Sequence, residues 1–468
     1  MSVIKLDGYN LSLEDLIKVS RFNHKVELTE NAVERIKKSR AIVDDLVENE
    51  KVSYGITTGF GKFSDVVISK KDTHKLQINL IRSHACGVGN PLSEEIVRAM
   101  MLLRINALSK GYSGIRLETL QILIDMLNKG VHPIVPEKGS LGSSGDLAPL
   151  SHMVLTMIGE GEAIYKGEKM SSKDALEKAG IKPLEYLSSK EGLSLNNGTQ
   201  CMTAIGAITA YDAINLMKTA DIALGLTMEG LNGITCAMDE RVNLVRPHKG
   251  QFNTAKNVLE ILQGSEMTTE QGELRVQDSY TLRCSPQVHG GCKDALDYVI
   301  KKVEIEMNSV TDNPIIFPGE NQKIISGGNF HGEPMALAFD FLGIALSEIA
   351  NISERRLEKM VNPALSHGLP AFLVNEGGVN SGFMIVQYSA ASLVSENKVL
   401  SHPASVDSIP SSANQEDHVS MGTIASRHAR DILDNARKVL AMEILASAQA
   451  IDLRGKKKLG KGTEEAYK

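Results

Sequence analysis

The chain reads Gly-Ser-Leu-Gly-Ser-Ser-Gly-Asp-Leu-Ala-Pro-Leu from Gly139 to Leu150. Its glycines recur at every third residue, which allows sharp bends and a close approach of backbone to backbone. Asp146 and Pro149 then favour a helix N-terminus, because proline is tolerated in a first turn and an acidic side chain suits the positive end of the helix dipole. The stretch therefore predicts a tight glycine-serine loop that leads directly into a helix.

This loop has three interpretations. It is a plain turn before a helix, or an anion cradle, since amides exposed at a helix start attract phosphate or carboxylate. The third interpretation is a loop that reacts with itself. The nitrogen of Gly145 attacks the carbonyl carbon of Ser143, because glycine has no side chain to block the approach. Loss of one water on ring closure, and of the Ser144 hydroxyl as a second, leaves 4-methylideneimidazol-5-one, an electrophile that needs no external cofactor.

The composition is that of a soluble globular protein. The chain has 468 residues, of which 42% are hydrophobic and 23% charged, so a large core is available. The net charge of −6 offers no basic field for nucleic acid and no face for an anionic membrane. Tryptophan is absent and aromatic residues make up only 4%, which argues against base stacking. We therefore expect neither a nucleic-acid partner nor a membrane.

The cysteine pattern indicates a reducing compartment. The five cysteines form no Cys-x-x-Cys pair and are scattered over the chain at Cys86, Cys201, Cys236, Cys284 and Cys292. This is typical of free thiols in the cytoplasm. No His-Glu-x-x-His motif or other metal-ligand spacing occurs, so no metal site is expected. The first seven residues lack a long apolar core, so we expect no signal peptide and a cytoplasmic protein.

Hydrophobic periodicity predicts a mainly α-helical protein. One clear early helix spans residues 30–47, and residues 160–170 predict a small hairpin. From residue 195 onward the helical patterns become long and have no strands between them, which favours a bundle. A long apolar helix opens at residues 197–200. Further patterns cover residues 288–307, 334–361 and 418–450, and parts of 221–236 and 383–400. We expect an N-terminal domain over 1–195, which carries the loop, and a bundle over 196–468 whose apolar faces also pack against other subunits.

The longer stretch Gly139–His152 resembles the signature of the aromatic amino acid ammonia-lyases of the methylideneimidazolone type, most closely that of their histidine-specific members. One position differs, because the family usually has alanine where this chain has Ser143. The resemblance implies that Ser143-Ser144-Gly145 forms the ring. We expect cyclisation to survive, since residue 143 contributes its carbonyl carbon and Cα to the ring and its side chain projects outside.

The resemblance also implies the architecture and the assembly. It indicates a long-helix bundle of the ammonia-lyase and fumarase-like type, with a smaller N-terminal domain, assembled as a homotetramer. The chain ends at Lys468, where members of the family usually continue, so we expect the C-terminal tail of the family to be absent.

A second glycine-rich loop, from Ser53 to Phe63, superficially suggests a nucleotide site. It fails the P-loop pattern, because Phe63 follows Lys62 in place of Ser or Thr, and it fails the Rossmann spacing. It does match the family's Tyr-Gly-x-x-Thr-Gly-Phe-Gly loop. That match implies that Tyr54 is a catalytic base placed over the electrophile.

Two later segments match the family as well. Gln-Asp-Ser-Tyr-Thr-Leu-Arg, at 277–283, implies that Gln277 and Arg283 bind substrate and that Tyr280 is catalytic beside the electrophile. Arg283 suits a substrate carboxylate, because a guanidinium offers two parallel donors. The Gly-Asn-Phe-His segment implies that Phe330 packs near the prosthetic ring, and Asn197 is expected to help fix the carboxylate and the loop.

The choice of substrate depends on His84 and Glu416. By itself, His84 is a histidine near the carbonyl end of a helix; its Ser-His context resembles the histidine-specific enzymes, in which this position contacts the substrate ring. Glu416 lies in Asn-Gln-Glu-Asp-His, whereas phenylalanine enzymes have an amide there. A carboxylate can hydrogen-bond an imidazole nitrogen or accept a proton. The resemblance thus implies deamination of L-histidine to trans-urocanate and ammonia, the first step of histidine degradation.

Three alternatives stay open. A related tyrosine or phenylalanine ammonia-lyase or aminomutase is disfavoured by His84 with Glu416. A non-catalytic helical scaffold that has lost its prosthetic group is supported only by Ser143. A fumarase-type lyase is also helical and tetrameric, but it would lack Tyr54 and the Asn-Gln-Glu-Asp-His run.

We predict that the ring forms despite Ser143. Freshly purified active protein should weigh less than the unmodified chain by the mass of two water molecules, because ring closure and dehydration each release one. Ser144→Ala should abolish this mass loss and nearly all activity. An intact mass equal to that of the unmodified chain would contradict the prediction.

Overall fold

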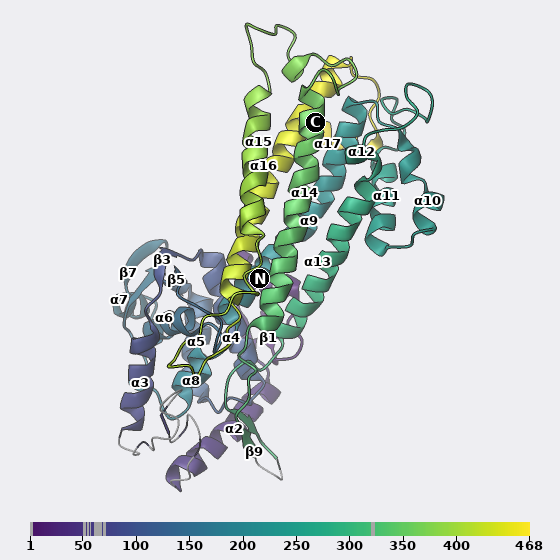
Figure 1. Ribbon diagram of the computed structural model, residues 1–468. Coiled ribbons are helices and arrows are strands. Elements are labelled where there is room, and N and C mark those ends of the chain that lie inside the picture. The colour runs from purple at the N-terminus through teal and green to yellow at the C-terminus, as the bar shows by residue number, and fades with distance from the viewer. Residues whose placement is uncertain are drawn as a thin grey trace. The chain divides into compact units, whose positions relative to one another are not determined.

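The structure is a computed structural model that describes residues 3–49, 53, 56, 58–59, 68, 72–319 and 323–468. Helices account for 59% of it, which confirms the mainly α class (Figure 1). The chain divides into two compact units. The first unit comprises Met1–Ile208, Lys301–Ala338 and Pro403–Arg427, and the second comprises Thr209–Ile300, Phe339–His402 and His428–Lys468. Each unit consists of three separate segments of the chain. The predicted boundary at residue 195 divides the chain into two consecutive domains, and it stays a prediction.

The N-terminal part of the chain forms short helices, as Figure 1 shows. They are α1 (Leu13–Phe22), α2 (Glu30–Glu48), α3 (Thr73–His84), α4 (Glu94–Ser109), α5 (Leu117–Lys129), α6 (Leu147–Met157), α7 (Ser172–Lys178) and α8 (Glu191–Asn196). Thr29 begins α2, because its side chain accepts a hydrogen bond from Ala32 N. Helix α4 is the centre of this part: its residues from Ile96 to Ser109 are all buried, so the helix is enclosed on all sides, polar side chains such as Arg104 included.

The strands are short and lie outside the long helices. They are β1 (Ile4–Leu6), β2 (Val26–Leu28), β3 (Val88–Pro91), β4 (Val131–Pro133), β5 (Pro136–Lys138), β6 (Glu162–Tyr165), β7 (Glu168–Ser171), β8 (Ile315–Phe317) and β9 (Lys323–Ile325). The antiparallel pair β6 and β7 confirms the predicted hairpin. Sequence analysis missed the other strands because segments of three or four residues are too short to show an alternating pattern.

Long helices make up most of the remaining chain. They are α9 (Gln200–Gly230), α13 (Ser285–Met307), α14 (Glu333–Val361), α15 (Met384–Leu400) and α16 (Gly422–Leu453). Shorter elements are η2 (Thr235–Met238), α10 (Glu240–Leu244), α11 (Lys249–Ile261), α12 (Tyr280–Arg283), η3 (Ala371–Leu373) and α17 (Lys461–Tyr467). Helix α9 begins at Gln200, where a long apolar helix was expected to open, and it ends at Gly230, so it contains part of the pattern over 221–236. The chain reverses there, and Asn232 adopts a left-handed conformation with φ 50°.

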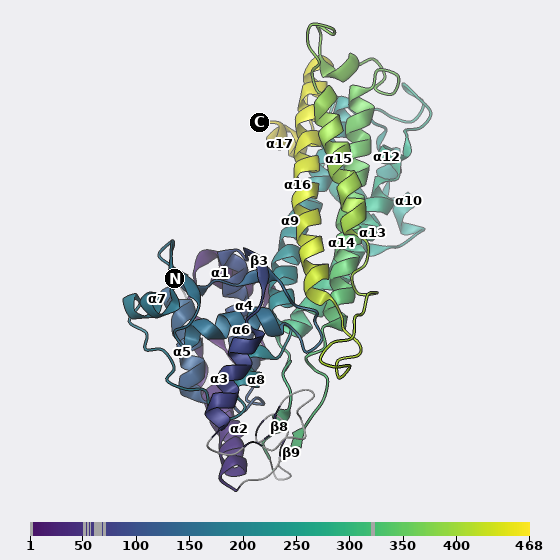
Figure 2. The ribbon, with the colours of Figure 1, turned by 60° about the vertical axis from the view of Figure 1, so that its left-hand side comes forward.

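Buried charges connect the long helices of the second unit, which run side by side in Figures 1 and 2. Arg356 of α14 and Glu443 of α16 form an ion pair in which both side chains are fully buried, with N–O distances of 2.5 and 2.9 Å. Thr227 of α9 donates a further hydrogen bond to Glu443 at 2.7 Å. His289 of α13 contacts both Arg356 and Asp221 of α9. Because a buried charge is tolerated only when it is paired and hydrogen-bonded, this network specifies how the helices align.

Among the described residues, α14 is long and apolar enough to cross a bilayer by length and composition. However, 67% of its apolar window is buried inside the protein, as expected for the core helix of a bundle.

Candidate active site

The glycine-serine loop of residues 139–146 has the conformation that its glycines permit. Gly139, Gly142 and Gly145 have φ values of 130°, 68° and 76°, which L-residues with side chains rarely adopt. A Cβ atom on Gly145 would lie 2.1 Å from the carbonyl oxygen of Gly198. The backbone amide of Asp146 donates to that same oxygen at 2.7 Å. Position 145 therefore requires glycine for two independent reasons, its conformation and the close approach of another backbone.

Asp146 joins three chain segments through its buried carboxylate. Oδ1 accepts hydrogen bonds from Ser140, at 3.0 Å, and from Thr423 of α16, while Oδ2 accepts one from the backbone amide of Met202 in α9 at 2.9 Å. Asp146 precedes α6 as expected, but its side chain does not cap that helix. Its function in tying segments together was missed by sequence analysis, because its partner Thr423 lies 277 residues away.

The electrostatic balance at Asp146 is set by burial. The side chain is 0% exposed, and loss of water raises the pKa of its carboxyl. The hydrogen bonds from Thr423, Met202 and Ser140 stabilise the anion and oppose this rise. Burial thus makes these donors obligatory, since an unsatisfied carboxylate in this place would be strongly destabilising.

The loop is also held from its other side. Ser420 Oγ donates to the carbonyl oxygen of Gly142 at 3.0 Å, and the amide of Met421 donates to that of Leu141 at 2.9 Å. A Cβ atom on Gly142 would lie 2.2 Å from Ser420 Oγ. The segment before α16 and the loop before α6 therefore determine each other's position.

Ser144 has two contacts that bear on chemistry. Asn197 Nδ2 donates to the Ser144 carbonyl oxygen at 3.1 Å, and Ser144 Oγ donates to Glu416 Oε1 at 3.0 Å. The second amide atom of Asn197, Oδ1, is buried and has no hydrogen-bond partner among the described residues. A buried polar atom without a partner is unusual, so Asn197 Oδ1 is a candidate acceptor for a ligand in this place.

Arg104 holds the backbone of Asn197 in place through a hydrogen bond. Its guanidinium is fully buried and donates to the carbonyl oxygens of Ser194, at 3.0 Å, and Asn197, at 2.8 Å, and to the side chain of Gln200. Burial lowers the pKa of Arg104 to about 10, so it remains charged at neutral pH. No sequence motif marks this residue, because the two buried arginines of α4, Arg98 and Arg104, form no recognisable pattern.

A cleft of about 500 Å³ opens over Ser144. Its lining comprises Ser143, Ser144, Leu193, Asn197, Asn313, Ser326, Gly327, Phe330, His331, Gln415, Glu416, Asp417 and His418. The structure thus brings together five residues that the sequence nominated from four separate segments: Ser143, Ser144, Asn197, Phe330 and Glu416. A cleft of this volume suits a small molecule the size of an amino acid.

His84 is the last residue of α3 and is half-buried. Burial lowers its pKa below the ordinary value, and the negative charge of Glu416 opposes this in part. Ser83 Oγ lies 3.0 Å from His84 Nδ1. The imidazole is therefore neutral at physiological pH and lies within the electrostatic reach of Glu416.

The other sequence-nominated residues are not in the described lining of this cleft. Tyr54 lies outside the described residues. Gln277, Tyr280 and Arg283 belong to the second unit, where Arg283 stacks over the Tyr280 ring at 4.5 Å and donates to the carbonyl oxygen of Asp278 at 2.9 Å. Tyr280 is 68% exposed and Gln277 is also exposed, so neither has a packing function within the second unit.

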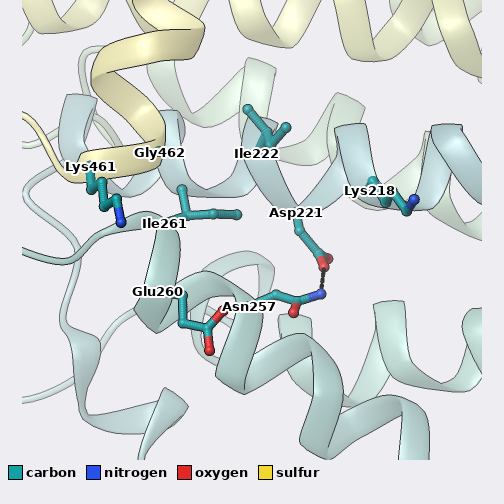
Figure 3. A pocket seen from close by; sticks show the side chains of 8 residues that line it. All are labelled: Lys218, Asp221, Ile222, Asn257, Glu260, Ile261, Lys461 and Gly462. Atoms are coloured by element: carbon teal, nitrogen blue, oxygen red, sulfur yellow. Dashed lines mark hydrogen bonds between the residues drawn. The ribbon is translucent and has the colours of Figure 1, made fainter.

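A different cavity, of about 420 Å³, lies in the second unit between α9, α11 and α17 (Figure 3). Its wall includes Lys218, Asp221 and Asn257. The Asp221 carboxylate already accepts hydrogen bonds from Asn257, His289 and Lys293, so its charge is neutralised by the protein. Asp221 is therefore not available as a free carboxylate to a ligand in this cavity.

Comparison with known proteins identifies the family of this chain. The model of the aromatic amino acid lyase family matches residues 11–468. Histidine ammonia-lyase of Alkaliphilus oremlandii is 67% identical over 467 residues, which cover 100% of this chain and 92% of that protein. The crystal structure of histidine ammonia-lyase from Trypanosoma cruzi has a TM-score of 0.92 and 42% identity, covering 100% of this chain and 88% of that one. Pantoea agglomerans phenylalanine aminomutase has a TM-score of 0.96 and 35% identity, covering 100% of this chain and 93% of that one.

The chain belongs to the aromatic amino acid lyase family. It is a carbon–nitrogen lyase of the ammonia-lyase kind, and the methylideneimidazolone group of the family forms from the chain itself, without an external cofactor. The residues present fit that group: Gly145 has no Cβ, has φ 76°, and follows a serine whose carbonyl oxygen accepts from Asn197.

Replacement of Gly145 by alanine should abolish ring formation. The added Cβ atom would meet the Gly198 carbonyl oxygen at 2.1 Å, so the loop has to move away from Asn197. The matched control is Gly167→Ala, because Gly167 also has positive φ, at 81°, but has nothing within 4 Å of the added atom. The control should lose only about 1–2 kcal/mol of stability and keep its intact mass. Equal masses for the two variants would contradict this explanation.

Proposed function

We propose that this chain catalyses the non-oxidative deamination of L-histidine to trans-urocanate and ammonia, the reaction of a histidine ammonia-lyase and the first step of histidine degradation. The relatives of high identity are named for this reaction and match the chain over its whole length. The observation that carries the proposal is the position of Glu416, whose carboxylate lies 3.0 Å from Ser144 Oγ and lines the cleft.

Glu416 and His84 offer complementary partners for a substrate imidazole. A neutral imidazole has one donor nitrogen and one acceptor nitrogen, and a carboxylate accepts from the donor. We infer that Glu416 takes this bond and that His84 contacts the ring from the end of α3. A phenyl ring offers no donor to the carboxylate oxygen that faces it in this partly buried place, which disfavours a phenyl substrate.

The reaction explains why the other residue types are needed. Deamination removes a β-proton that is hardly acidic, and general acid–base catalysis supplies only about 10²–10⁴-fold. The prosthetic ring supplies an electrophile that makes the nitrogen a better leaving group. We assign Tyr54 as the base for the β-proton and Tyr280 as a further catalytic residue. Asn197 holds the Ser144 carbonyl, and Phe330 packs at the wall of the cleft.

We assign the substrate carboxylate to Arg283 and Gln277. A guanidinium binds a carboxylate through two parallel hydrogen bonds, and this orientation of the substrate contributes directly to rate. Arg283 uses its Nε atom for the carbonyl oxygen of Asp278, which leaves its terminal nitrogens for a ligand.

The alternative is a tyrosine or phenylalanine ammonia-lyase or aminomutase. The fold does not decide between these reactions, since the Pantoea agglomerans phenylalanine aminomutase has a TM-score of 0.96. Two observations favour histidine. The chain is 67% identical to a histidine ammonia-lyase and 35% identical to that aminomutase. In addition, the Glu416 carboxylate lines the cleft, and an apolar substrate ring has no group that could hydrogen-bond to it.

We also propose a cytoplasmic homotetramer. Helix α14 exposes a stripe of large apolar side chains, Leu337, Phe341 and Ile344, at helical spacing. Tyr388 of α15 and Leu445 of α16 are more than half exposed as well. Such side chains on neighbouring helices suit contact with other copies of the chain. The exposed thiols of Cys86 and Cys236 are consistent with a reducing compartment.

The wild-type protein should turn over histidine far better than phenylalanine, and the double variant His84→Leu, Glu416→Gln should reduce this preference. Loss of a partner for a buried polar group costs about 1–3 kcal/mol, so the ratio of kcat/KM values should change roughly tenfold to a hundredfold. Steady-state kinetics with histidine, tyrosine and phenylalanine measure it. Equal turnover of histidine and phenylalanine by the wild type would refute the substrate and leave the lyase class intact.

The tetramer should be visible in solution. Small-angle scattering of active protein should report a mass close to four chains, because the apolar stripe on α14 is covered by neighbouring copies. Phe341→Glu should shift the protein towards smaller species, whereas Lys438→Glu, at an exposed side chain of α16, should not. A monodisperse active monomer would rule the assembly out.

A further inference from the structure

The segment from Ser411 to Glu416 closes on itself. The amide of Ser411 donates to the carbonyl oxygen of Glu416 at 2.9 Å, and the amide of Glu416 donates back at 3.3 Å. Between them Ser412, Ala413 and Asn414 have φ values of 52°, 53° and 64°. Consecutive left-handed residues other than glycine are rare, persist only where the surroundings hold them, and gather at functional sites. The turn therefore presents Glu416 from a fixed backbone.

The two carboxylate oxygens of Glu416 bind different hydroxyls. Ser144 Oγ donates to Oε1 at 3.0 Å, and Ser411 Oγ donates to Oε2 at 3.0 Å. Ser144 and Glu416 line the cleft, whereas Ser411 is not among the described residues that do. Oε1 is therefore the oxygen on the side of the cleft, and Ser411 holds the carboxylate by its other oxygen.

Ring formation removes one of these two hydrogen bonds. The Ser144 hydroxyl leaves as water when the prosthetic group forms, so the contact at Oε1 belongs to the chain before maturation. The contact at Oε2 involves no group that reacts. In the mature protein Oε1 becomes available to a ligand in the cleft, and of the two serine hydroxyls only that of Ser411 still orients the carboxylate. The terminal torsion of a glutamate is broad, so a carboxylate without this bond would rotate freely.

We propose that Ser411 is a positioning residue for the reaction. Its hydroxyl holds Oε2 of Glu416, so that Oε1 faces the imidazole of the substrate in one orientation. This inference rests on the proposed function, because it takes Glu416 as the group that binds the substrate ring. A group that makes one hydrogen bond to a substrate needs its rotamer locked by a neighbouring contact to be effective.

The test begins with three variants. Ser411→Ala should lower kcat/KM for histidine roughly ten- to a hundredfold, the range spanned by a hydrogen bond to a charged group. Ser411→Thr keeps the hydroxyl and should restore most of the activity. Ser412→Ala is the matched control, since Ser412 is exposed in the same turn and no hydrogen bond of its hydroxyl is described. All three should show the intact mass that lacks two waters.

A double-variant cycle separates positioning from a merely structural effect. In a Glu416→Gln background, Ser411→Ala should change kcat/KM by less than about twofold, the scatter of independent sites, because the carboxylate it orients is gone. The cycle is measured with whichever of histidine, tyrosine and phenylalanine the wild type turns over fastest. A preference for phenylalanine would then contradict the proposed substrate, while the cycle still decides the function of Ser411.

Four results would overturn the inference. They are an unaltered kcat/KM in Ser411→Ala, an equal loss in both backgrounds, no recovery in Ser411→Thr, and a Ser411→Ala protein without the mass deficit. The last result would assign the hydroxyl to ring formation instead.

Discussion

The buried carboxylate of Asp146 is the interaction on which the site depends. It is fully buried, and a charge in that place is tolerated only because donors from separate segments converge on it. Two of these donors lie at helix starts, because Met202 is in the first turn of α9 and Thr423 is in the first turn of α16. The positive ends of these two helix dipoles reduce the cost of burying the anion. In return, the carboxylate determines where the loop of residues 139–146 lies relative to the segment that leads to Glu416.

Two residues with unfavourable backbone conformations lie in segments that support this site. Lys190 has a left-handed backbone, with φ 72°, and its side chain forms a fully buried ion pair with Asp312 at 2.9 Å. Met421 also has a positive φ, at 55°, directly beside its hydrogen bond to the loop. Such residues persist because the surrounding packing and hydrogen bonds determine them. These backbone conformations reduce the stability of the fold. In exchange, the polar groups of the cleft are held in place before any ligand binds, which allows them to orient a substrate effectively.

The fold serves a family of reactions, and the substrate is chosen by few side chains. The same architecture occurs in phenylalanine aminomutase at a TM-score of 0.96 and in histidine ammonia-lyase at 0.92, so overall shape carries no information on the substrate. In the function we propose, the choice is made by groups such as Glu416, whose carboxylate has a partner in an imidazole and none in a phenyl ring. Its orientation in turn depends on a neighbour, Ser411, that no substrate contacts.

The sequence by itself determined the chemistry and the class of fold. Ser143-Ser144-Gly145 identifies the reactive loop, because only glycine allows the close approach that cyclisation requires, and long helical periodicities determine a mainly α protein. Short strands such as β1 and β8 were beyond sequence analysis, since three residues show no period. The partners of the site were decided by tertiary structure alone. Ser144 and Glu416 are 272 residues apart, and Asp146 and Thr423 are 277 residues apart. Hydrogen bonds between segments so far apart follow from how helices pack, and no local pattern encodes them.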